Sequence, residues 1–144
     1  MKKIVLVSGG FDPLHSGHIE YFKEARKLGD ELIVGVNSDM WLKKKKGKPF
    51  LILKERMEII KNLKMVEKVK TWDDADGSAI KLIECLLIEE KGNLIIFANG
   101  GDRTEENIPE LEKFKNNQNI SFSFGVGGTK KINSSSKILK EWKI

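Results

Sequence analysis

Short runs of apolar residues alternate along this chain with segments whose apolar residues recur every three or four positions. The short runs favour β-strands, which we predict at 3–7, 32–36, 67–72, 94–98 and 120–124. The helical recurrence predicts helices at 17–28, 53–63, 78–90, 109–116 and 135–142. Gly92 follows one of these helices and Pro109 opens another, which is typical of helix ends and starts.

Strands that alternate with helices predict a parallel sheet with right-handed crossover connections. The strands at 3–7, 32–36 and 94–98 are continuously apolar, as strands covered on both faces are, whereas the other two are more polar and suit the edges. We therefore predict a single α/β domain over 1–144. Its architecture is a Rossmann-like three-layer sandwich, with a five-stranded parallel sheet of order 3-2-1-4-5 and helices on both faces.

This strand order has its switch point between the first and fourth strands. Ligands of such sheets bind beyond the carboxyl ends of the strands at that point. We therefore expect the loops at 8–16 and 99–107 to face the same ligand.

The chain of 144 residues has the length of one domain, for which about 150 residues is a usual size. Its longest apolar run, 94–98, falls far short of the about 20 residues that a membrane-spanning helix needs. The apolar stretch at 4–7 is also too short for a signal peptide, so we expect a cytoplasmic protein. The one cysteine, Cys85, falls in an apolar helical pattern, and we expect it to be buried.

The net charge of +5 comes from one place, because five lysines lie within 43–48 and the rest of the chain is neutral. This distribution indicates a local anion site or a solvated loop, and not a generally basic surface for nucleic acid. RNA binding by the lysine loop remains an alternative. That loop lacks the interleaved aromatic residues that such surfaces use.

The segment Ser8–His18 combines glycines with both histidines of the chain, His15 and His18. Glycines allow close approach of the backbone, and the helix that follows attracts anions to its N-terminus. A zinc site would need a third ligand, and Cys85 lies in another helix, so we assign no metal ligand. The P-loop pattern and the GxGxxG dinucleotide pattern are both absent.

The sequence Gly-Phe-Asp-Pro-Leu-His-Ser-Gly-His at 10–18 resembles the G-x-F-D-x-x-H-x-G-H signature of the cytidylyltransferase-like nucleotidyltransferases. The glycerol-3-phosphate cytidylyltransferases and the heptose-1-phosphate adenylyltransferases are the most similar groups. Further segments that resemble these groups are 25–30, 36–39, 46–47, 55–57, 100–102 and 134–138.

The resemblance implies transfer of CMP or AMP from CTP or ATP to a small phosphorylated alcohol or sugar, with release of pyrophosphate. It also implies Mg²⁺ bound with the nucleotide, and a homodimer. The implied catalytic residues are His15, His18 and Lys46, and Asp12 is implied to be structural. The two histidines also belong to the implied nucleotide contacts, whose other members are Ser8, Gly9, Gly10, Phe11, Asp102, Ser134, Ser135 and Ser136. The implied acceptor contacts are Lys44, Lys46, Arg56 and Arg103.

Some positions depart from the family pattern or allow a plainer interpretation. The serine motif lacks the preceding arginine of many relatives, and Lys130 or Lys131 takes its place, so CTP and ATP both stay open. Asp102 suits either a ligand contact or a loop cap, and Arg103 suits either a ligand contact or a surface charge. Ser134 suits a helix N-cap as well as a phosphate contact. The acidic loop Asp73–Asp76 either contacts the acceptor or is a solvated turn. A catalytically inactive nucleotide-binding protein is the alternative function.

Overall fold

A computed structural model describes residues 1–101, 108–128 and 134–142. Five parallel strands form one sheet in the order β3-β2-β1-β4-β5, which confirms the predicted topology. Their bounds are β1 Lys3–Gly9, β2 Glu31–Val36, β3 Lys68–Lys70, β4 Leu94–Gly100 and β5 Ile120–Val126.

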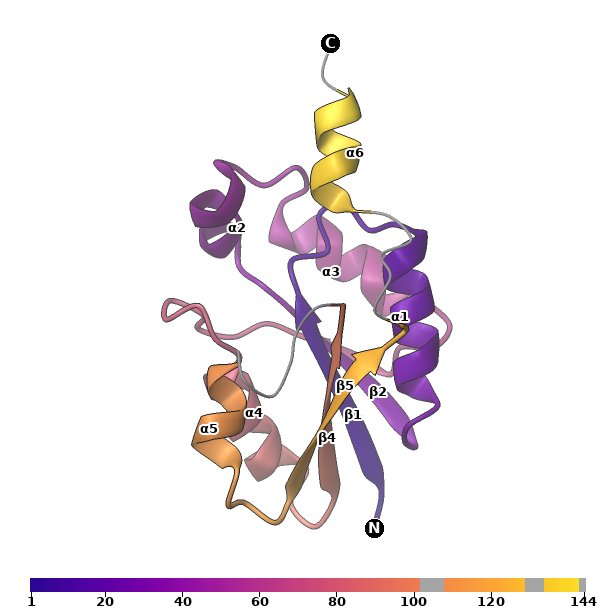
Figure 1. The fold of residues 1–144 in the computed structure, drawn as a ribbon, viewed down its shortest axis with the longest axis vertical. Helices are drawn as coiled ribbons and strands as arrows, with labels where there is room; N and C mark the ends of the chain where they lie inside the picture. Colours follow the sequence, from indigo (N-terminus) through magenta and orange to yellow (C-terminus); the bar gives the residue numbers. More distant parts are fainter. Residues whose placement is uncertain (102–107, 129–133, 143–144) are drawn as a thin grey trace.

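Helices cover both faces of the sheet, as predicted (Figure 1). Their bounds are α1 Ser16–Arg26, α2 Asp39–Lys46, α3 Leu53–Lys61, α4 Ile80–Glu89, α5 Pro109–Phe114 and α6 Ser135–Trp142. Figure 1 shows α4 and α5 on one side of the sheet, α1 and α3 on the other, and α6 beyond the carboxyl ends of the strands. None of the helices in the described segments is long and apolar enough to cross a membrane.

The core lies in two layers because the central strands bury side chains on both faces. One layer packs Phe97 and its neighbours on the sheet against α4 and α5. The other packs Phe22 of α1 and Ile60 of α3 against the opposite face. Residues 4–7 of β1 are completely buried, which confirms this strand as a central one. Because β1 and β4 are paired in parallel between these layers, their carboxyl ends lie beside each other.

The lysine run forms the last turn of helix α2, so our prediction of a loop there is wrong. Ser38 begins the helix, since its hydroxyl oxygen accepts a hydrogen bond from the Trp41 amide at 3.1 Å. Lysine favours helices, and positive charge at a helix C-terminus is stabilised by the helix dipole. Gly47, at φ +94°, ends the helix in a conformation that suits glycine.

The prediction that Cys85 is buried is also wrong. The apolar stripe of α4 consists of Leu82, Ile83 and Leu86, and Cys85 lies outside that stripe. Its thiol is exposed and lies 3.1 Å from a carboxylate oxygen of Glu89, which raises the thiol pKa. An apolar helix covered on one side has room for only a narrow buried stripe.

Candidate active site

A cleft of about 570 Å³ opens beyond the carboxyl ends of the strands at the switch point between β1 and β4. Its walls come from residues 8–12, helix α1, helix α2, the loop after β3, the end of β4, the segment 126–128 and the start of α6. Residues 8–12 and 99–101 line this one cleft, although 99 and 100 are the end of β4 and not loop residues. That the two segments face the same ligand stays a prediction. Asp102 and Arg103, and also Lys130 and Lys131, lie outside the described residues.

His15 and His18 lie side by side at the start of α1 and line this cleft. Their rings stack with centroids 3.8 Å apart, and Phe11 meets the His18 ring edge-on at 5.1 Å. The Nδ1 atom of His15 accepts a hydrogen bond from the Gly17 amide at 3.0 Å. The Nδ1 atom of His18 accepts one from the His15 amide at 3.2 Å. These two bonds form a reciprocal cap at the helix start.

This cap also decides where each imidazole carries its proton. A nitrogen that accepts a hydrogen bond from an amide has no proton of its own, so each neutral ring carries its proton on Nε2. The pKa of His18 is lowered to about 3, first by burial and then by the charges of His15 and Lys46. Burial also lowers the pKa of His15. Both rings are therefore neutral at pH 7, and each has one N–H donor on Nε2.

Positive charge enters the cleft from the last turn of α2. The Lys46 ammonium donates a hydrogen bond to the carbonyl oxygen of Asp12 at 2.6 Å, and burial lowers the pKa of this lysine. Lys45 also lines the cleft, and its ammonium lies 4.7 Å from the centre of the Trp41 ring. Lys44 is exposed and lies outside the cleft lining, whereas Lys45 lines the cleft. The acceptor contact expected of Lys44 stays a prediction.

The structure assigns Arg56 a different role from the predicted acceptor contact. Its side chain is fully buried and lies outside the lining of the cleft. It donates hydrogen bonds to the carbonyl oxygens of Leu51, Gly10 and Asn37, and it forms an ion pair with Asp39 at 2.7 Å. A guanidinium bonded on all sides by its own chain holds the loops together. The prediction that Arg56 contacts the acceptor is therefore corrected.

Asp12 is structural, as the resemblance implies. Its buried carboxylate accepts hydrogen bonds from the amides of Phe50 and Leu51 and so ties the histidine loop to the chain before α3. Gly10 is needed for packing, because a Cβ there would come within 2.9 Å of Leu42. Gly10 therefore lets α2 approach the histidine loop closely. Gly10 lies in the cleft lining together with the other residues predicted in that loop, Ser8, Gly9 and Phe11.

The serine motif closes the far wall of the cleft, and all three serines line it. The Ser134 hydroxyl oxygen accepts a hydrogen bond from the Lys137 amide at 3.4 Å, which confirms Ser134 as the N-cap of α6. The Ser135 hydroxyl donates to the carbonyl oxygen of Pro13 at 2.8 Å. This bond brings the N-terminus of α6, with its partial positive charge, to the histidine loop.

Several residues of the cleft were not predicted from the sequence. The sequence gives no signal for Trp41 and Lys45, because the pattern predicts a loop where helix α2 lies. Trp72 was missed although it follows β3 at the carboxyl edge of the sheet, which is the signal that could have found it. Its indole N–H donates to the carbonyl oxygen of Ser78 at 2.9 Å, and this bond holds the ring against the cleft wall.

The fold is that of a Rossmann-like α/β protein, and a cleft lined by His15, His18, Lys45 and Lys46 lies at its switch point. Residues 6–140 match the family model described as cytidylyltransferase-like. The chain belongs to the cytidylyltransferase-like family, which confirms the resemblance seen in the sequence.

Individual relatives agree with this assignment. The chain is 41% identical over 113 residues to the bifunctional protein HldE of Haemophilus influenzae. That match covers 70% of this chain and 24% of HldE, so the chain spans about a quarter of the relative's length.

Two solved structures are also similar. The lipopolysaccharide core biosynthesis protein of Thermoplasma volcanium is 28% identical with a TM-score of 0.65, covering 92% of this chain and 100% of that chain. A Vibrio parahaemolyticus protein assigned as a nicotinate-nucleotide adenylyltransferase shares the fold. It has a TM-score of 0.67 and 17% identity over 97% of this chain and 86% of that chain.

Proposed function

We propose that this chain is a nucleotidyltransferase that joins CMP or AMP to a small phosphorylated alcohol or sugar. A phosphate oxygen of the acceptor attacks the α-phosphorus of the nucleotide, and a new P–O bond forms. The bond to the β-phosphate breaks, and pyrophosphate leaves with the electron pair. The observation that carries the proposal is the stacked pair of neutral, Nε2-protonated histidines at the switch-point cleft. The family assignment supports it.

This reaction needs positioning and charge neutralisation more than it needs a protein nucleophile. Negative charge moves towards the leaving pyrophosphate as the bond breaks. We assign the Nε2–H groups of His15 and His18 to the phosphate oxygens, where fixed donors stabilise the developing charge. Lys46 supplies positive charge to the same oxygens. The N-terminus of α6 at Ser134–Ser136 binds the terminal phosphates.

The acceptor is proposed to lie against Lys46 and the wall that contains Trp72 and Ser78. An indole face suits the apolar side of a sugar or polyol. Asp102 and Arg103 stay predictions for the nucleotide and the acceptor, respectively. The backbone groups of residues 126–128, which line the cleft, are proposed to contact the base and so to decide between CTP and ATP.

Mg²⁺ is proposed to enter together with the nucleotide, because it prefers phosphate oxygens and water as ligands. Among the described residues, no three acidic, histidine or cysteine side chains gather where they could hold a metal ion. These residues do not form a metal site, and we assign no catalytic step to the ion.

We further propose that the protein is a homodimer located in the cytoplasm, where nucleoside triphosphates are available. The dimer proposal rests on the resemblance alone, because the groove beside the edge strand β3 is lined by six charged side chains as well as by Leu53, Met57 and Val69. Light scattering tests the dimer against the monomer mass of 16.3 kDa. Cell fractionation tests the location.

Pyrophosphate release tests the activity. Wild type is incubated with Mg²⁺, CTP or ATP, and a panel of polyol phosphates and sugar phosphates. We expect release with one nucleotide and one acceptor class. In His18→Asn the rate of release should fall at least about 100-fold, because the asparagine oxygen replaces Nδ1 as an acceptor but nothing replaces the Nε2–H donor. Nucleotide binding without release for any acceptor would favour the catalytically inactive alternative. Salt-sensitive RNA binding without nucleotide binding would favour the RNA alternative.

A further inference from the structure

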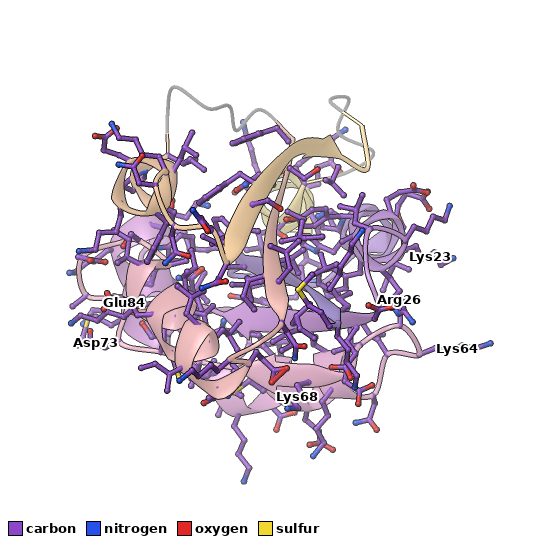
Figure 2. All side chains as sticks on the ribbon, turned by 90° about the horizontal axis from the view of Figure 1, so that it is seen from below. Lys23, Arg26, Lys64, Lys68, Asp73 and Glu84 are labelled. Carbon is purple, nitrogen blue, oxygen red and sulfur yellow. The ribbon has the colours of Figure 1, made fainter. Side chains whose placement is uncertain are left out.

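The acidic loop after β3 contains one aspartate that is unlike its neighbours. Asp74 is 6% exposed, whereas Asp73 and Asp76 are both exposed to solvent. Figure 2 shows Asp73 at the rim of the molecule. It pairs there with Lys81 at 3.0 Å. The carboxylate of Asp74 instead points inward and contacts the segment that begins α2.

Three donors converge on the Asp74 carboxylate. One oxygen accepts hydrogen bonds from the Asn37 side-chain amide at 2.9 Å and from the Ser38 backbone amide at 2.8 Å. The other oxygen accepts from the Ser38 hydroxyl at 2.6 Å. Because that hydroxyl also accepts from the Trp41 amide, it links the carboxylate to the first turn of α2. A negative charge at a helix N-terminus is stabilised by the helix dipole.

Helix α2 depends on such an anchor. It has eight residues, and a helix of this length is marginal without outside contacts. Its last turn contains Lys45 and Lys46, which line the cleft. The segment around Asp74 also lines the cleft, through Trp72 and Ser78. Asp74 therefore joins two walls of one cleft without lining the cleft itself.

We propose that Asp74 is a positioning residue of the active site, which fixes the N-terminus of α2 and thereby sets where Lys46 enters the cleft. The inference rests on the proposed function only in taking Lys46 to bind phosphate. It also gives the acidic loop a role that the sequence left open: one of its aspartates is structural for the lysine helix, and the other two are solvated.

Hydrogen exchange tests the anchor without any ligand. In Asp74→Asn, the amide oxygen can still accept from the Asn37 amide and the Ser38 backbone amide, but an NH₂ group replaces the oxygen that accepts from the Ser38 hydroxyl, and the negative charge is lost. We expect the amides of residues 41–46 to exchange at least about tenfold faster, while those of α1 and β1 stay unchanged. Asp73→Asn is the matched control and should leave α2 unchanged. Wild-type exchange of α2 in Asp74→Asn would overturn the proposal.

Calorimetric titration with inorganic pyrophosphate tests the link to Lys46. We expect Asp74→Asn to weaken pyrophosphate binding about tenfold, roughly the loss of one charge-assisted contact. The same substitution in a Lys46→Met background should have a clearly smaller effect, because the group on which it acts is gone. An equal effect in both backgrounds would mean that Asp74 does not act through Lys46, and would overturn that step.

Two further outcomes separate the causes of failure. If wild type does not bind pyrophosphate, the proposed function fails, while the exchange experiment still decides the role of Asp74. If the circular dichroism spectrum shows that Asp74→Asn does not fold, Ser38→Ala takes its place in both experiments. This change removes only the hydroxyl between Asp74 and the Trp41 amide. The same local acceleration in α2 and the same dependence on Lys46 are then expected, and unchanged values overturn the proposal.

Discussion

Acidification should destabilise the fold through His18. Burial in the cleft wall, together with the charges of His15 and Lys46, lowers the pKa of His18 from 6.5 to about 3. The unfolded chain therefore binds a proton at His18 between these two values, while the folded protein does not. Stability falls as the pH falls through this window, and it is fully present above pH 6.5.

The magnitude follows from the two pKa values. At pH 5 an unfolded His18 with a pKa of 6.5 is almost fully protonated, and a folded one with a pKa of about 3 is almost fully neutral. This difference costs the folded state about 2 kcal/mol at pH 5 relative to pH 7. Such a loss corresponds to a shift of roughly 1 M in the urea midpoint for a small domain.

Urea denaturation at pH 7 and at pH 5 measures this loss, with His18→Asn as the reference. The asparagine oxygen can accept from the His15 amide in place of Nδ1, so the helix cap is retained, but it does not titrate. Wild type should lose about 2 kcal/mol more than the variant between the two pH values, since the other titrating groups are shared. Equal losses in the two proteins would refute the assignment of a buried, neutral His18.

Three further substitutions test the site and its support. Lys45→Ala should weaken pyrophosphate binding about tenfold in calorimetry, and Lys44→Ala less than about twofold, because only Lys45 lines the cleft. Arg56→Met should cost about 3 kcal/mol in urea denaturation, since it leaves one buried and two partly buried carbonyl oxygens without their donor. Gly35→Ala should lower the melting temperature by the equivalent of about 1–3 kcal/mol, because its Cβ would collide with Leu82.

Much of the fold could be predicted because the signals are local. The continuous apolar runs at 4–7 and 94–98 identify buried central strands, and strand-helix alternation with the crossover rule leaves few sheet orders. The position of His15 and His18 at the switch point follows from the same topology. Ser134 could be identified as an N-cap from its residue type and its place before a periodic segment.

The remaining features depend on contacts between distant parts of the chain. Helix α2 has little apolar periodicity, and its N-terminus is fixed by Asp74, which lies 36 residues after Ser38. In the sequence, Arg56 resembles an exposed residue of a surface helix. Its burial is favourable only because the fold brings three carbonyl oxygens from separate loops to its guanidinium. Lys44 and Lys45 are alike in the sequence, and only the rotation of α2 distinguishes them.

Thermal unfolding with Mg²⁺ and each of CTP, ATP, GTP and UTP tests most directly whether the cleft holds nucleotide phosphates. At 100 times its dissociation constant, a nucleotide that binds the folded state stabilises it by about 2.7 kcal/mol, which is a readily measured shift in melting temperature. We expect a clear shift with CTP or with ATP in wild type, and a smaller one in His18→Asn. The absence of any shift with all four nucleotides would contradict a nucleotide site at the histidine pair.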